Sequence, residues 1–198
     1  QNSKFHSVYG VFLIQQEKFN DAKPHFEKAI KYDPNNIISL NNLGWILSLS
    51  RFSQYQEAKN YLLKASKLRP TNASIQFNLA RLLAHAFGRE ELQNAKRYYL
   101  AALTNDAQNS HIHFFYAVFL TFMLKDKISG KKHLKKSQDF LQNSMSSNKD
   151  GTDMTFEVNG YIEHAKILQQ ESKFEAARFL LQRAVKLDMT KRREIMEL

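Results

Sequence analysis

One pattern of side chains recurs along this chain and constrains its fold more than any other feature of the sequence. Residues 19–29, 55–65 and 174–184 each carry an aromatic residue, an alanine three positions later, a bulky apolar residue four positions after that, and a second alanine three positions further on. Steps of three and four residues return to the same face of an α-helix. The pattern therefore predicts amphipathic helices whose apolar face alternates small and bulky side chains. The pattern residues are Phe19, Ala22, Phe26 and Ala29, then Tyr55, Ala58, Leu62 and Ala65, then Phe174, Ala177, Leu181 and Ala184.

This pattern resembles the tetratricopeptide repeat family, and the resemblance extends from about residue 3 to about residue 191. Small residues let two helix backbones approach each other, and a bulky residue fills the gap beside them. The family's glycine, alanine, bulky, alanine and proline positions hold Gly10, Ala22, Phe26, Ala29 and Pro34 in the first copy, and Gly44, Ala58, Leu62, Ala65 and Pro70 in the second. The third copy has Ala80, Ala95, Tyr99 and Ala102, and the fourth has the atypical Gly130, Leu134 and Ser137.

The resemblance implies an all-α fold, a right-handed superhelical solenoid of antiparallel helix pairs. One helix pair cannot bury its apolar face alone, so neighbouring repeats are expected to stack. We expect a single domain of about five repeats, at 3–36, 37–72, 73–109, 110–148 and 158–191, within a longer parent chain. The expected helix pairs are 4–16 with 19–32, 38–51 with 54–68, 74–87 with 90–105, 111–125 with 129–144, and 155–170 with 174–187. The polar stretch 142–152 is rich in turn formers and is expected to be a loop.

The composition excludes several classes of protein. The chain has no cysteine, which removes disulfide scaffolds, cysteine-ligated zinc and thiol nucleophiles. Six glycines and three prolines are too few for the many turns of a β-sandwich or β-barrel. The histidines are scattered, and His111 and His113 are two residues apart, which points them to different faces of a helix. We therefore expect no enzyme activity, no catalytic residues, no bound metal and no cofactor.

The resemblance also implies a partner-binding groove, because the first helix of each repeat lines the concave face in this family. Counting from each repeat start gives an aromatic strip with one arginine and one histidine, side chains that are common interface anchors. Packing between helices is the alternative role for the phenylalanines of this strip. Trp45 is expected to be partly exposed, because Leu43 and Leu47 already supply the apolar face of its helix. The predicted groove residues are Asn41, Trp45, Phe77, Arg81, His85, Phe114, Val118 and Phe122.

A cluster of lysines accounts for much of the uneven charge of the chain. The net charge is +10, from 29 Lys+Arg against 19 Asp+Glu. Lysines four residues apart lie on one helix face, where their repulsion costs helix stability. The sequence therefore predicts a basic patch on the second, convex helix of the fourth repeat, facing an acidic protein, nucleic acid or anionic lipid; a solvated face is the alternative. The basic patch consists of Lys125, Lys127, Lys131, Lys132, Lys135 and Lys136.

Together these features predict a protein–protein interaction scaffold, a subunit or module of a larger assembly that holds a partner's helix or extended peptide in the groove. Two alternatives stay open. One is a nucleic-acid-binding repeat protein, although the lysines lack the interleaved aromatic residues that stack on bases. The other is a docking or regulatory arm of an enzyme encoded elsewhere in the parent chain. We expect an intracellular protein, for which cytoplasm, cilium, nucleus and mitochondrial matrix fit equally well.

Overall fold

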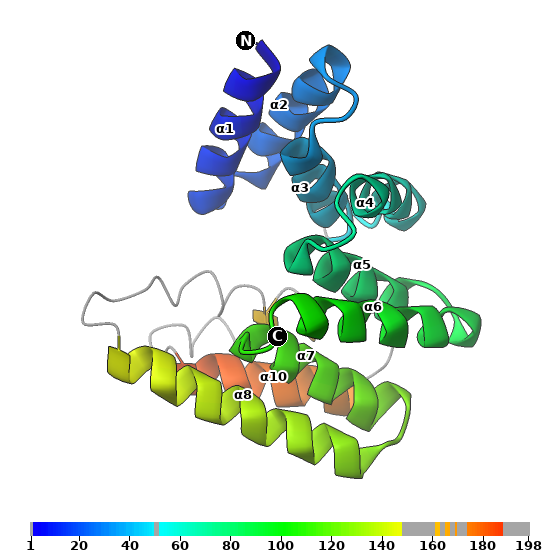
Figure 1. Ribbon diagram of the computed structural model, residues 1–198, viewed down its shortest axis with the longest axis vertical. Helices are drawn as coiled ribbons and strands as arrows, with labels where there is room; N and C mark the ends of the chain where they lie inside the picture. Colours follow the sequence, from blue (N-terminus) through cyan, green and yellow to red (C-terminus); the bar gives the residue numbers. More distant parts are fainter. Residues whose placement is uncertain are drawn as a thin grey trace. The chain divides into compact units, whose positions relative to one another are not determined.

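Every regular element in the described part of the chain is a helix (Figure 1). The computed structural model describes residues 2–49, 52–147, 161–162, 165–166, 169 and 174–187. The helices fall into two units, which are treated separately below: unit 1 holds residues 1–86 and 93–105, and unit 2 holds residues 87–92 and 106–198. The all-α fold predicted from the sequence is confirmed. A single domain of five repeats stays a prediction.

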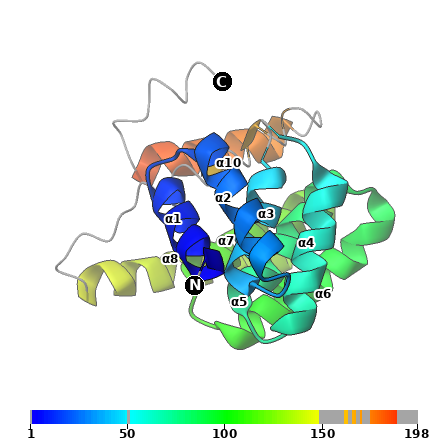
Figure 2. The same cartoon turned by 90° about the horizontal axis from the view of Figure 1, so that it is seen from above.

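Unit 1 is built from helices that pack in the order in which they follow one another along the chain (Figures 1 and 2). They are α1 Asn2–Gln15, α2 Phe19–Tyr32, α3 Ile37–Leu47, α4 Tyr55–Leu68, α5 Ala73–Ala86 and α6 Leu92–Asn105. Contacts join α1 to α2, α2 to α3, α3 to α4, and α4 to α5. α1 and α3 are therefore first helices of a repeat, and α2 and α4 are second helices that also cover the next repeat. The expected helices of these three repeats are confirmed to within four residues at each end, whereas the expected helix 155–170 lies largely outside the described residues.

Close approach of two backbones at a small residue holds each of the first two pairs together. A Cβ atom added at Gly10 of α1 would lie 2.8 Å from the Phe26 ring of α2. A Cβ atom added at Gly44 of α3 would lie 2.7 Å from Leu62 Cγ of α4. Phe26 and Leu62 are fully buried, so the predicted contacts between small and bulky residues are confirmed. The pattern alanines of these two repeats, Ala22, Ala29, Ala58 and Ala65, are fully buried as well.

Asparagine side chains start the first helices of three repeats. Oδ1 of Asn36, Asn72 and Asn109 accepts a hydrogen bond from the backbone N–H three residues ahead, at 2.9, 3.1 and 3.0 Å. Each bond satisfies an amide that has no partner inside its own helix. The prolines at Pro34 and Pro70 end the preceding helices, because the residue before a proline is disfavoured in helical geometry. Helix ends and helix starts therefore follow directly from local sequence.

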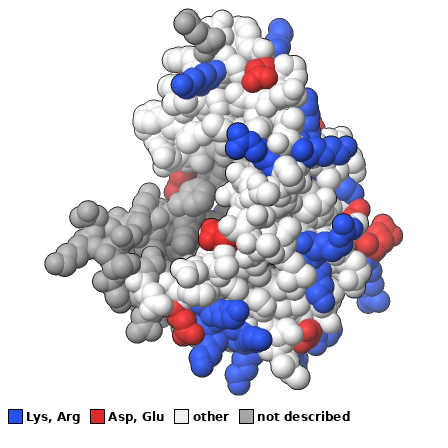
Figure 3. All heavy atoms as spheres, in the orientation of Figure 1, with Lys and Arg blue, Asp and Glu red and all other residues white. Residues whose placement is uncertain are grey.

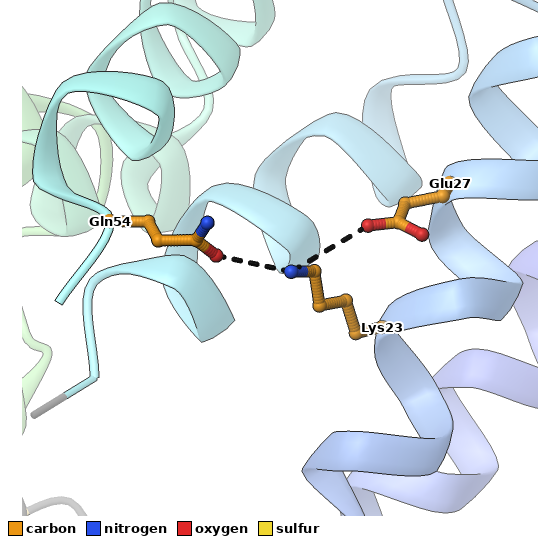
Figure 4. Close-up of polar contacts among 3 residues, drawn as sticks. All are labelled: Lys23, Glu27 and Gln54. Atoms are coloured by element: carbon orange, nitrogen blue, oxygen red, sulfur yellow. Dashed lines mark hydrogen bonds and ion pairs between the residues drawn. The ribbon is translucent and has the colours of Figure 1, made fainter. Parts of the chain in front are cut away.

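A polar network at the surface links the first two repeats (Figure 4). Lys23 Nζ on α2 donates to Gln54 Oε1, just before α4, at 3.1 Å, and lies 3.8 Å from Glu27 Oε1. The ring centroid of Phe52 is 5.8 Å from the same ammonium group. Exposed ion pairs of this kind contribute roughly 0–1 kcal/mol. The stability of unit 1 therefore comes from the buried contacts rather than from this network.

Unit 2 contains the fourth repeat and part of the fifth, and it departs from α-helical geometry at one point. α7 spans Ser110–Val118 and continues into a π-helical turn at Phe119–Met123; α8 spans Lys127–Ser147 and α10 spans Phe174–Leu187. A π turn absorbs one extra residue within a helix. Thirteen positions separate Ala117 from Gly130, whereas twelve separate the corresponding Gly10 and Ala22 of the first repeat. The π turn therefore takes up an insertion that would otherwise move Gly130 out of its packing position.

The atypical residues of the fourth repeat still provide a close helix contact. Gly130 is buried, and a Cβ atom added there would lie 3.1 Å from the Ala117 carbonyl oxygen and would clash with Thr121 Oγ1. Ser137, at the second small position, is also buried, and Leu134 is half-buried. Glycine in place of alanine thus brings α8 directly against the backbone of α7.

Two predicted boundaries differ from the structure. α3 ends at Leu47, where the N–H of Gln54 binds the Leu47 carbonyl, instead of continuing toward residue 51. α8 continues to Ser147, because no glycine or proline interrupts it after Gly130. The first part of the expected loop is therefore helical, and its residues 148–152 lie outside the described residues.

The last repeat keeps its small positions but shifts its bulky one. Ala177 and Ala184 on α10 are buried, as predicted. Leu180 is fully buried, whereas Leu181, the predicted interior residue, is half-buried. The prediction that Leu181 fills the interior is wrong by one position. Leu180 and Leu181 are adjacent leucines, so the sequence pattern alone does not distinguish which of them is buried.

Gly44→Val should destabilise the fold, because its Cβ would have to displace Leu62 and would lie 3.2 Å from the Ala58 carbonyl oxygen. We expect the free energy of unfolding to fall by about 2 kcal/mol, a typical cost of overpacking. Urea unfolding followed by circular dichroism measures this loss. Gly88→Val is the matched control, since the nearest atom to a Cβ there is Glu90 Oε1 at 4.0 Å. Equal losses at both glycines would contradict the close-contact explanation.

Candidate partner-binding surfaces

Trp45 is a half-buried tryptophan on α3. Its indole meets the ring of Phe19 edge-on, with ring centroids 5.5 Å apart and planes at 74°. Leu43 and Leu47 are fully buried, so the apolar face of α3 is complete without Trp45. The predicted partial exposure of Trp45 is confirmed. An indole that is fixed on one side and accessible on the other is suited to anchor a partner.

Two asparagines near Trp45 connect the first helices of repeats two and three. Asn78 Nδ2 on α5 donates to Asn41 Oδ1 on α3 at 3.1 Å, and both side chains are half-buried. Each amide has further hydrogen-bonding groups, Asn41 Nδ2 and Asn78 Oδ1, that can pair with a peptide backbone. Sequence reasoning missed Asn78, because counting along the repeat selected its neighbour Phe77.

The other predicted groove residues of unit 1 are buried side chains of α5. Arg81 and His85 are only 5% and 4% exposed, and Phe77 is buried as well. Phe77 packs edge-on against Tyr99 of α6 at 6.2 Å, and the Arg81 guanidinium lies 5.7 Å from the Phe77 ring. The His85 ring meets Tyr55 of α4 at 5.9 Å. Phe77 and His85 hold α5 against its neighbours, and all three residues offer little accessible surface.

The predicted groove residues of unit 2 also serve packing. Phe114 is fully buried between Tyr161, at 4.7 Å, and Phe179 of α10, at 5.8 Å, which is the alternative role considered for it. Val118 is buried at the end of α7. Phe122 is half-buried and lies inside the π turn, 5.9 Å from Phe179. One inserted residue rotates the following side chains by about 100°, so α-helical counting does not apply to Phe122.

All residues of the basic patch are exposed, and Figure 3 shows Lys and Arg side chains gathered over α8. Asp126 Oδ1 accepts from the N–H of Ser129 at 3.0 Å and so caps the start of α8. The amino-terminal end of a helix is its positive end, which adds to the field of the lysines. Ile128 is 87% exposed at the same end of the helix. Five of the lysines lie on α8, namely Lys127, Lys131, Lys132, Lys135 and Lys136, and Lys125 directly precedes it.

A pair of histidines joins α7 to α8 beneath this patch. His113 Nδ1 and His133 Nδ1 are 2.8 Å apart, and His113 Nε2 lies 3.0 Å from the Ala107 carbonyl oxygen. When His113 is neutral and donates from Nε2 to that carbonyl, its Nδ1 accepts from His133 Nδ1–H, and the contact cannot persist with both rings protonated. His111 turns to another side, against Phe115 at 4.7 Å, so the prediction of different faces is confirmed. Twenty positions separate the paired histidines, and no local spacing in the sequence signals such a pair.

Burial lowers the pKa of His133 to about 4, with smaller contributions from His113, Lys136 and Lys132. Burial likewise lowers the pKa of His113. In both cases the charged form is disfavoured, because a proton would add charge to a half-buried site next to lysines. Burial therefore favours the neutral form of both rings.

The stability of the chain should fall as the pH drops from 6.5 toward 4. In that window the unfolded chain protonates His133, whose ordinary pKa is 6.5, while the folded chain, with a pKa of about 4, does not. The stabilisation is complete above pH 6.5 and is lost on acidification. His133→Gln should reduce the loss between pH 7 and pH 4.5 by about 1–2 kcal/mol, since half-burial discounts the full linkage value. Urea unfolding at both pH values measures this difference, and an unchanged pH dependence in the variant would contradict it.

The described part of the chain offers neither a metal site nor a membrane span. No three His, Asp or Glu side chains in it come close enough to hold an ion. None of its helices combines the length and apolarity needed to cross a bilayer. Among the predicted site residues, Trp45 and Asn41 are partly accessible to solvent, and the lysines of the basic patch are exposed.

Solved structures with the same fold cover most of this chain at low sequence identity. A thermophilic TPR protein of Thermus thermophilus is 14% identical, with a TM-score of 0.66 over 98% of this chain and 97% of its own. A crystal structure of MamA is 15% identical, with a TM-score of 0.57 over 97% of this chain and 94% of its own. An O-GlcNAc transferase of Thermobaculum terrenum is 18% identical, with a TM-score of 0.56. The match covers 61% of this chain and only 22% of the transferase. Identities this low establish the fold alone.

Sequence comparison identifies the family. No curated protein matches the chain. Three models of the tetratricopeptide repeat match residues 4–36, 25–60 and 43–110, and together they span more than half of the sequence. With the helix pairs and the close contacts at Gly10 and Gly44 in place, the chain belongs to the tetratricopeptide repeat family.

Proposed function

We propose that this chain is a non-enzymatic interaction scaffold, a module of a larger assembly that binds a segment of a partner protein at the surface around Trp45. Membership of the tetratricopeptide repeat family supports a protein-interaction role in general. The observation that carries the more specific proposal is the half-buried indole of Trp45, held by Phe19 and not needed for the core.

The chemistry around Trp45 favours a segment that offers both backbone groups and an apolar side chain. The indole provides a flat apolar surface, whereas the joined amides of Asn41 and Asn78 provide a donor and an acceptor for a peptide backbone. Because Phe19 and the Asn41–Asn78 bond already fix these groups, little side-chain entropy is lost when a partner binds. An extended peptide or the exposed end of a helix has these features.

Trp45→Ala should weaken binding of the partner by about 30-fold, which corresponds to a hot-spot loss of about 2 kcal/mol. The partner is first captured from a nuclease-treated lysate with the unaltered chain, and its binding segment is then titrated against both chains by calorimetry. Helix content and melting temperature of the variant should stay close to those of the unaltered chain, because Leu43 and Leu47 form the core face of α3.

Leu100→Ala is the matched control for this experiment, since Leu100 is an exposed apolar residue of the same unit on α6. Its affinity for the partner segment should equal that of the unaltered chain. Equal affinity of the Trp45 variant, or an equal loss in both variants, would contradict the proposed site.

A second candidate function, binding of an acidic surface or nucleic acid, is favoured by the exposure of the basic patch at the positive end of α8. Lysine–phosphate contacts release counterions, so affinity for a single-stranded RNA should fall with salt by a log–log slope of about 0.7 per contact. The exposed Ile128 gives such a surface one apolar contact in addition. This candidate uses α8 and is independent of Trp45.

Changing Lys131, Lys132, Lys135 and Lys136 to Gln should reduce the salt slope for an RNA oligonucleotide by about 3, if each lysine makes one phosphate contact. Fluorescence anisotropy at several salt concentrations from about 50 to about 200 mM measures the slope. Four exposed lysines of unit 1 changed to Gln serve as the charge-matched control and should leave more of the slope intact; they are Lys28, Lys31, Lys64 and Lys67. Identical slopes for both variants would show that only net charge is involved and would reject a specific basic site.

A further inference from the structure

α1 carries an exposed apolar face that the fold of unit 1 does not use. Phe5, Val8, Tyr9 and Phe12 are 63%, 59%, 40% and 48% exposed. Their spacing of three and four residues places them on one side of the helix. Scattered exposed apolar residues are ordinary, but a contiguous stripe of this kind marks an interaction surface. These residues are called the α1 face below.

The α1 face is an ordered surface. The Phe5 and Tyr9 rings stack with centroids 6.1 Å apart and planes within 4°, and the Phe12 ring stacks on Tyr9 at the same separation. The His25 ring of α2 supports Tyr9 edge-on at 4.6 Å. Rings that are already fixed lose little entropy when another element packs on them.

The repeat register shows what occupies the equivalent face elsewhere in the same chain. Relative to the small residue at the close helix contact, Phe5 and Tyr9 of the α1 face lie five positions and one position before it, and Phe12 lies two positions after it. At these positions the second and third repeats are buried to 1% exposure or less, and there α2 lies against α3 and α4 lies against α5. The corresponding residues are Phe5, Tyr9 and Phe12 around Gly10, Ser39, Leu43 and Ile46 around Gly44, and Ile75, Leu79 and Leu82 around Ala80.

The start of α1 also has the sequence of an internal repeat. Asn36, Asn72 and Asn109 cap their helices eight positions before the small residue of their repeat, and Asn2 stands eight positions before Gly10. In the three internal cases the capping asparagine ends a four-residue turn that follows the second helix of the preceding repeat. Asn2, the first residue of α1, therefore has the same spacing to its small residue as the three capping asparagines.

We propose that the α1 face is an inter-repeat docking surface, which receives the second helix of a further tetratricopeptide repeat carried by the same polypeptide. That helix packs on Phe5, Tyr9 and Phe12 as α2 packs on α3 and α4 on α5. The proposal concerns a different face from the one around Trp45 and does not depend on the proposed function.

The size of the face favours a covalently joined helix over a second copy of the chain. A 14-residue helix is about 21 Å long and presents a strip about 10 Å wide, on the order of 200 Å². Stable interfaces between separate proteins bury about 800 Å² on each partner. A helix in the same polypeptide avoids most of the entropy cost of association, so a strip of this size is sufficient.

The existing interfaces define the chemistry of the docking helix. Where α4 covers α5, Ala65 packs with Ile75 and Leu40, and Tyr61 lies at the edge of this cluster. An alanine at the centre lets the helices approach, and an apolar residue one turn earlier closes the edge. Because the α1 face carries phenylalanines at positions that are Ser39, leucine or isoleucine in the other repeats, its docking helix should have a smaller residue at the edge.

The test adds such a helix in register and measures whether it covers the α1 face. Residues 37–72 are copied ahead of Ser3, so that the copied Asn72 replaces Asn2. The chain has no cysteine, so Phe12→Cys gives a single reporter thiol at a position whose equivalents are fully buried. Labelling by a maleimide under native conditions should be at least tenfold slower in the extended chain than in the original one, and the extended chain without the reporter should melt at a higher temperature.

Two variants of the added copy make the result decisive. Tyr61→Ala in the copy alone makes room for the aromatic side chains and should protect at least as well. Ala65→Lys in the copy alone places a charge at the centre of the contact and should restore fast labelling. Fast labelling and an unchanged melting temperature with both the native and the Tyr61→Ala copies would overturn the proposal. A dimer of the original chain in sedimentation that Phe5→Ser abolishes would also overturn it, by assigning the face to a second copy.

Discussion

The contact between a small residue on one helix and a bulky side chain on the next is the interaction on which the described repeats depend. At Gly10 and Gly44 there is no space even for a Cβ atom, and Phe26 and Leu62 fill the gap completely. Helices this close bring their remaining apolar side chains within van der Waals distance along their length, where many weak contacts add up. The exposed Lys23 network adds little to this, since water screens it.

The same constraint explains where the chain tolerates irregularity. Insertions in the second and third repeats fall between helices, where Ser53 adopts a positive φ of 50° and residues 89–91 form a short 3₁₀ turn. The insertion in the fourth repeat falls inside a helix, and a π turn absorbs it so that Gly130 keeps its place against Ala117. The cost of a π turn is local, whereas a misplaced small residue would disrupt the whole helix pair.

This dependence also sets how much could be predicted from the sequence. The helix pairs, their capping asparagines and the small–bulky contacts are encoded within about 35 residues, and the sequence predicts them well. Whether Arg81 or Phe114 is accessible depends on helices from other repeats, and periodicity within one helix does not contain that information. The His113–His133 pair and the Asn41–Asn78 bond join residues 20 and 37 positions apart, so neither leaves a local pattern. Trp45 was predictable because its own helix shows that the core face is already filled.

The accessible surfaces of this chain are what remains after each repeat has packed on its neighbours. The position five residues before the small residue illustrates this: Ser39 and Ile75 are buried because a second helix covers them, and Phe5 is exposed where none does. Exposure there is a property of the stack and not of the residue type, since the buried Ser39 is far more polar than the exposed Phe5. Trp45 differs, because α3 already packs against α2 and α4 and Trp45 is still only half-buried. Its exposure therefore does not depend on a missing neighbouring repeat. A side chain with that property suits the proposed partner site, whereas the α1 face suits the proposed docking of a further repeat.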